Sequence, residues 1–199
     1  MKIRVIFILT VMLCCLTIMS GCDADDESNY KVDKEKAEAF AGPILEKLKS
    51  ETPVYAEDFS DNSKGWYINT EESYGYTANV STEGKYDLDI DTKQLGADFP
   101  DSPILSDFVL QFDFVYKSGG NDSSCYFIYR NQEVLEPGNS NSYGLEIYYN
   151  SLLRLYKYIQ EYGGDATIRD INMDKFDLLE VNTYTIIVKG TTHIVYVND

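Results

Sequence analysis

The sequence is poor in the residues that build metal sites and disulfide frameworks. Its 199 residues include one histidine and four cysteines. Cys14, Cys15 and Cys22 lie within or directly after an apolar N-terminal run, so the rest of the chain holds only Cys125. This excludes an intramolecular disulfide from the folded part, and the single His193 lies in no cluster that would suit zinc or a Ser-His pair. We expect Cys125 to be a small buried strand residue.

Positive charge is also scarce. The chain has 17 Lys and Arg against 33 Asp and Glu, which gives a formal net charge of -16. A surface this acidic repels phosphate backbones, so nucleic acid is excluded as a partner class. There is one Trp, but 17 Tyr and nine Phe make the composition that of an aromatic-rich β protein rather than a disordered chain.

The N-terminus has the three-part layout of an export signal. Two basic residues precede an apolar run from Val5 to Met19, and Ser20-Gly21-Cys22 follows. The run is about 15 residues long, shorter than the roughly 20 that span a bilayer. The stretch resembles a bacterial lipoprotein signal, in which small residues stand directly before the lipidated cysteine. Met19 departs from that pattern, because Leu is usual there.

The resemblance implies that residues 1–21 are a signal peptide and that Cys22 becomes the lipidated end of the mature chain. The protein would then be held at the cell membrane or outer envelope, facing the extracytoplasmic side. A plain secretory signal and a single-pass anchor are the alternatives.

Residues 22–53 are expected to form an acidic linker and an amphipathic helix. From Asp33 to Ser50, apolar residues recur at spacings of three and four, which is typical of a helix with one buried face. Asp33 is the candidate N-cap, and Pro43 predicts a kink or two short helices.

From residue 54 to residue 199 the pattern is that of short strands separated by turn residues. Phe108–Lys117 is the clearest strand, since aromatic and aliphatic residues alternate with Gln111 and Asp113. The predicted strands are 54–59, 65–68, 74–81, 85–91, 108–117, 125–130, 143–149, 152–159, 184–189 and 193–197. Ten short strands with little helix predict an all-β fold, an antiparallel sandwich or barrel.

Several short motifs stand in a characteristic order along this region. They are Glu57-Asp-Phe-Ser-Asp61 with Gly65-Trp66, Gly84-Lys-Tyr86, Ser106-Asp-Phe108, Phe127-Ile-Tyr-Arg130, Ser142-Tyr-Gly144, Asn182-Thr-Tyr184 and Val195-Tyr-Val-Asn198. Together they resemble the concanavalin A-like (laminin G-like) jelly-roll sandwich of bacterial surface proteins, a superfamily that includes the 3-keto-disaccharide hydrolase-like domain. Members usually continue past the last motif with a closing strand, so the resemblance implies that the last strand pair of the sandwich of residues 54–199 is incomplete or that the chain is a truncated product.

Two acidic stretches suggest chemistry. Asp58 and Asp61 supply hard oxygen ligands at a turn, which suits calcium, although capping of the turn by these side chains is the alternative. Asp87, Asp89 and Asp91 point to one face of a strand. Laminarinase-type glycosidases of the superfamily use an acidic strand of similar form, so a glycoside-processing hydrolase with Glu146 as partner is a second alternative.

One face of the central strands carries aromatic and charged residues together. The candidate ligand-binding residues are Tyr126, Arg130, Glu146, Tyr148, Arg154 and Tyr156, with Tyr158 on the same parity. Sugars are held by aromatic faces and a few polar groups, so this mixture favours a glycan ligand. We therefore expect a lipid-anchored carbohydrate-binding module, not an enzyme, at the cell envelope. A protein-interaction module is the other alternative, and the sequence leaves the oligomeric state open.

Overall fold

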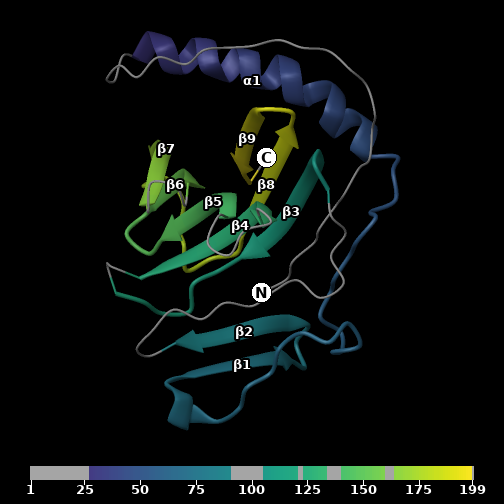
Figure 1. The fold of residues 1–199 in the computed structure, drawn as a ribbon, viewed down its shortest axis with the longest axis vertical. Coiled ribbons are helices and arrows are strands. Elements are labelled where there is room, and N and C mark those ends of the chain that lie inside the picture. The colour runs from purple at the N-terminus through teal and green to yellow at the C-terminus, as the bar shows by residue number, and fades with distance from the viewer. Residues whose placement is uncertain (1–26, 91–104, 121–122, 134–139, 160–163, 199) are drawn as a thin grey trace. The chain divides into compact units, whose positions relative to one another are not determined.

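The computed structural model describes residues 27–90, 105–120, 123–133, 140–159 and 164–198 (Figure 1). Within these ranges the elements are α1 (Glu27–Leu48), the short 3-10 helix η1 (Glu72–Tyr74), β1 (Tyr76–Ser81), β2 (Lys85–Ile90), β3 (Phe108–Phe114), β4 (Ser124–Glu133), β5 (Ser140–Tyr148), β6 (Leu152–Ile159), β7 (Gly164–Asn172), β8 (Asn182–Lys189) and β9 (Thr192–Val197). The strands form a two-stranded sheet β1-β2, a three-stranded sheet β3-β8-β9 and a four-stranded sheet β4-β5-β6-β7.

The chain divides into two compact units. One holds residues 113–183 with Asn198, and the other holds the described residues up to 112 together with residues 184–197.

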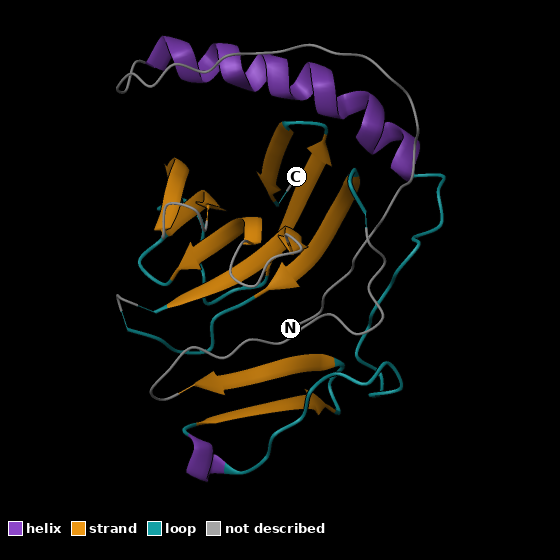
Figure 2. Ribbon diagram, viewed as in Figure 1, coloured by secondary structure: helices purple, strands orange, loops and turns teal. Residues whose placement is uncertain are grey.

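The first unit is built on the four-stranded sheet, in which each strand pairs antiparallel with the next along the chain (Figure 2). One face of this sheet is the core. The side chains buried on it are Phe127, Tyr129, Leu145, Ile147 and Leu153. Phe114, at the end of β3, meets Phe127 edge to face at 5.8 Å between ring centroids, and the Tyr116 hydroxyl donates to the carbonyl of Ile147 at 2.6 Å. The other face is therefore the one that can meet a ligand.

In the second unit α1 packs on the three-stranded sheet. Ala41 is fully buried with Val109 of β3 and Ile187 of β8. Around them pack the partly buried Phe40, Ile44, Leu45, Leu48, Ile194 and Tyr196. The helical stripe predicted from the sequence is thus the face that α1 buries. Within the described residues, no helix has both the length and the apolar content that crossing a membrane requires.

An aromatic cluster stabilises the remainder of the second unit. Trp66 lies 5.0 Å from Phe59 and 5.0 Å from Tyr86, measured between ring centroids. Beside them the buried carboxylate of Glu57 accepts from the Phe59 amide at 2.8 Å and from Trp66 Nε1 at 2.9 Å. The first of these hydrogen bonds holds the amide of Phe59, whose backbone is left-handed with φ of 53°.

The all-β class predicted from the sequence is confirmed, and the antiparallel sheets agree with a β-sandwich. Two predicted strands are wrong. Residues 54–59 alternate between buried and exposed as a strand would, but no neighbouring strand pairs with them in the described residues. Residues 65–68 are not a strand either. Asn69, the residue that follows them, forms an isolated bridge with Ala78.

The helix and one strand also differ from expectation. The helix begins at Glu27 rather than near Asp33, so Asp33 is not its N-cap, and Pro43 lies inside a single helix. Strand β7 was not predicted. The signal sequence, including Cys22, and Asp91 lie outside the described residues.

Candidate functional site

The outer face of the four-stranded sheet carries a row of functional side chains in direct register. Tyr126 of β4 pairs with Glu146 of β5, Glu146 pairs with Arg154 of β6, and Arg154 pairs with Asp170 of β7. Paired residues on one face of a sheet have side chains in contact range. One aromatic and three charged groups are therefore aligned across all four strands.

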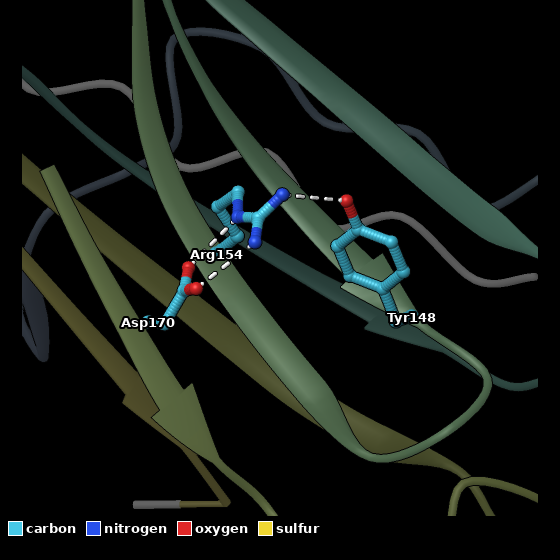
Figure 3. Close-up of polar contacts among 3 residues, drawn as sticks. All are labelled: Tyr148, Arg154 and Asp170. Carbon is cyan, nitrogen blue, oxygen red and sulfur yellow. Dashed lines mark hydrogen bonds and ion pairs between the residues drawn. The ribbon is translucent and has the colours of Figure 1, made fainter. Parts of the chain in front are cut away.

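Arg154 makes hydrogen bonds to both Asp170 and Tyr148 (Figure 3). Its Nε and Nη2 donate to the two carboxylate oxygens of Asp170 at 2.8 and 2.9 Å, and its Nη1 donates to the Tyr148 hydroxyl at 2.9 Å. The hydrogen bonds from Arg154 hold the pKa of Asp170 below its ordinary value. These contacts use three of the five guanidinium N–H groups, and they fix the plane of the guanidinium on the sheet.

Glu146 is the cross-strand neighbour of Arg154. It is only 3% exposed, and its Oε1 has no hydrogen-bond partner among the described residues. The pKa of Tyr148 is raised to about 12, chiefly by burial and then by a hydrogen bond to Glu146 and its charge. The Tyr148 hydroxyl thus links Arg154 to the carboxylate. A buried carboxylate oxygen without a donor is costly, so this oxygen marks a place where a donor from outside would be stabilised.

Tyr126 and Tyr156 form the aromatic part of the site. Their rings meet edge to face at 5.9 Å between centroids. Tyr156 is 5% exposed and lies across Gly144 of β5, where any Cβ would overlap its ring. Tyr126 is 41% exposed, and Ile128, two residues further along β4, is 56% exposed. Tyr156 is therefore the buried support of the site, whereas Tyr126 presents a ring to solvent.

The face places the aromatic ring of Tyr126 beside the polar groups of Glu146 and Arg154. The described side chains of the row include two carboxylates and one guanidinium. Such a face can hold a ring that stacks on Tyr126 while its polar substituents meet Glu146 and Arg154.

The structure brings together five of the six predicted ligand-binding residues. They are Tyr126, Glu146, Tyr148, Arg154 and Tyr156. Arg130 is in β4 and Tyr158 in β6, but their side chains lie outside the described residues. The sequence reasoning missed Asp170 and Gly144. A glycine inside an otherwise regular strand often marks close packing, and this signal could have identified Gly144. Asp170 belongs to β7, the strand that was not predicted.

The acidic turn of the second unit caps itself. One oxygen of Asp58 accepts from the Ser60 amide at 2.9 Å, and one oxygen of Asp61 accepts from the Ser63 amide at 2.8 Å. Hydrogen bonds from Ser63 lower the pKa of Asp61. In the part of the chain that the structure describes, no three His, Cys, Asp or Glu side chains form a group that could hold a metal ion. Calcium at Asp58 and Asp61 stays a prediction.

The acidic strand and Cys125 offer no comparable cluster. Asp87 and Asp89 are on β2 opposite Asn79 and Thr77 of β1, with Asp89 exposed. They belong to the second unit, and Glu146 belongs to the first. Cys125 is half-buried rather than buried as expected, and burial raises the pKa of its thiol to about 12, which leaves little nucleophilic thiolate at neutral pH.

Comparison with known proteins gives little. No family model matches the chain. No curated protein matches it either. Among solved structures, the carbohydrate binding module CBM66 from Bacillus subtilis is similar, with a TM-score of 0.37 and 17% sequence identity. The match covers 47% of this chain and 55% of that one, so the chain spans about half the length of that structure.

Proposed function

We propose that this protein is a carbohydrate-binding module, that its binding site is the outer face of the sheet β4-β5-β6-β7, and that a lipid on Cys22 holds it at the cell envelope. The observation that carries the binding proposal is the row of Tyr126, Glu146, Arg154 and Asp170, in which an exposed ring stands beside a buried carboxylate with an unpartnered oxygen.

The aromatic rings supply the apolar half of sugar recognition. A pyranose or furanose ring has a face of C–H groups that stacks on an aromatic ring. Tyr126 offers such a ring in solvent, held at its edge by the buried Tyr156. Because Tyr156 is itself packed on Gly144, the platform keeps its position before a ligand arrives, which lowers the entropy lost on binding.

The polar groups supply orientation. The guanidinium of Arg154 is fixed by Asp170 and Tyr148, and its remaining N–H groups are donors to a sugar oxygen. Glu146 is an acceptor for a sugar hydroxyl. A donor and an acceptor at fixed positions beside an aromatic ring are the groups that distinguish one sugar epimer from another.

The test is a glycan-array screen of the full chain, in a detergent that carries no sugar headgroup, with and without calcium. Tyr126→Ala is compared with Tyr74→Ala, since Tyr74 is an exposed tyrosine of η1 in the other unit. We expect loss of binding of about tenfold or more in Tyr126→Ala alone, because a stacked aromatic contributes roughly 1–3 kcal/mol.

Absence of binding to every glycan by a folded chain would overturn the proposal. The protein-interaction module would then be favoured by the exposed Ile128 and Ile168, which lie on the same sheet.

The anchoring proposal depends on the small residues before Cys22 and on the short apolar run. Mass spectrometry of the N-terminal peptide after expression in a bacterium tests it. We expect a diacyl or triacyl mass on Cys22 and the chain in the membrane fraction. The proposal would be contradicted if Cys22 of wild type carried no lipid and if wild type and Cys22→Ala were both found outside the membrane fraction.

A further inference from the structure

We propose, resting on the carbohydrate-binding function above, that the sugar bound at this face is uncharged and donates a hydroxyl hydrogen bond to Oε1 of Glu146, and that anionic sugars are rejected. Substrate class is thereby set by the charges of the face rather than by its aromatic rings.

The first argument is the buried carboxylate. Glu146 is 3% exposed, and Oε1 lacks a partner among the described residues. A hydrogen bond from a hydroxyl to a carboxylate is charge-assisted and is roughly twice as strong as one between neutral groups. Tyr126 is the register neighbour of Glu146 on β4, so a sugar that stacks on its ring lies beside this carboxylate. The ring of Tyr126 is 41% exposed and can be approached from solvent.

The second argument is that Arg154 does not serve as an anion receptor. Asp170 occupies its Nε and Nη2 in the bidentate geometry that a ligand carboxylate or sulfate would need, at 2.8 and 2.9 Å. A ligand anion would have to displace a carboxylate that is already aligned. Within the row, Arg154 is committed to Asp170, and Glu146 adds a second carboxylate beside it.

The third argument is the charge of the chain as a whole. A formal net charge of -16 gives an anionic polymer no electrostatic attraction and repels it during approach. An uncharged polymer is not repelled, so both the encounter and the bound state favour it. The fixed charges of the face then serve as hydrogen-bonding groups for hydroxyls.

The test uses matched polymers and the full chain. Isothermal titration is run with dextran, β-glucan, galactomannan and inulin, each beside its carboxymethylated derivative at one ionic strength. Wild type is compared with Glu146→Gln, which keeps the side-chain shape but removes the carboxylate. Glu180→Gln is the control, since it makes the same charge change at an exposed position of the same unit. Circular dichroism checks that each variant is folded.

We expect wild type to bind at least one neutral polymer more tightly than its carboxymethylated derivative. In Glu146→Gln, affinity for the neutral polymer should fall about tenfold and discrimination against the anionic one should shrink. Glu180→Gln should behave as wild type.

The inference is overturned if a carboxymethylated polymer binds more tightly than its neutral parent, or if Glu146→Gln binds the neutral polymer as well as wild type does. Either result leaves the carbohydrate-binding function standing. Lack of binding to every polymer overturns both.

Discussion

The ring of Tyr156 on β6 lies across the backbone of Gly144 on β5, where a side chain of any other residue would overlap it. This pairing makes the aromatic part of the site depend on a glycine two positions from Glu146. It also accounts for the burial of Tyr156, which is 5% exposed.

Replacing Gly144 by Ala should therefore damage both stability and binding. The added methyl group forces the Tyr156 ring off its position, and overpacking of this kind costs roughly 1–3 kcal/mol. Tyr126 loses its edge contact with Tyr156, so affinity for glycan falls as well. Gly120→Ala is the control, because its nearest neighbour is the Ser123 hydroxyl at 3.9 Å. Guanidinium unfolding followed by tyrosine circular dichroism measures the effect, and equal midpoints for the two variants would contradict the packing described.

Removing the buried carboxylate of Glu57 should loosen the aromatic cluster. Glu57→Ala leaves the Phe59 amide and Trp66 Nε1 without their acceptor, which destabilises the second unit by about 2 kcal/mol or more. Trp66 is the chain's one tryptophan, so its fluorescence reports on this cluster alone.

We expect a red-shifted emission and an earlier unfolding transition for Glu57→Ala. Glu71→Ala, at an exposed position nearby, should change neither. An emission maximum in Glu57→Ala that matches wild type would show that the two hydrogen bonds do not hold the cluster.

The Arg154–Asp170 pair should make binding sensitive to acid. Hydrogen bonds from Arg154 keep the pKa of Asp170 below its ordinary 3.8, so the pair stays intact above that value and is lost as the pH falls through the lowered pKa. The contribution of this pair to glycan affinity should be present at neutral pH and be lost only as the pH falls below 3.8.

Asp170→Asn isolates this effect, because its affinity is expected to be reduced already at neutral pH. The gap between wild type and Asp170→Asn should close as the solution becomes more acidic. A gap that persists below the pKa of Asp170 would show that its charge does not orient Arg154.

Calcium dependence decides the role of the turn at residues 58–63. If the carboxylates serve only to cap, Asp61→Ala lowers the unfolding midpoint slightly and by the same amount with calcium or with chelator. If they hold calcium, the metal raises the midpoint of wild type and not of the variant. The hydrogen bonds to the Ser60 and Ser63 amides favour the first outcome.

Strands with one buried face could be predicted from the sequence. From Leu110 to Phe114, β3 alternates because Leu110, Phe112 and Phe114 are buried and the residues between them are half-buried. β7 could not be predicted, since its described side chains, from Thr167 to Asn172, are all exposed and Ile168 falls at an irregularity in the pairing. A sheet edge without a buried face leaves no period-2 pattern.

The candidate site was predictable to the same degree. Parity placed Tyr126, Glu146, Tyr148, Arg154 and Tyr156 on one face, and the structure brings them together. Asp170 was missed with its strand. The burial of Glu146 could not be predicted either, because it follows from the cross-strand neighbours that cover it. Conversely, residues 55–59 alternate between buried and exposed like a strand, but the amide of Phe59 donates to the Glu57 carboxylate instead of to a neighbouring strand.

The most direct test of the account is hydrogen exchange of the full chain, measured by mass spectrometry with and without the tightest-binding neutral glycan. We predict that the glycan slows amide exchange in β4, β5 and β6 and leaves β1, β2 and α1 unchanged. Protection centred on β1 and β2, with none in the four-stranded sheet, would contradict the central claim that this sheet face is the binding site.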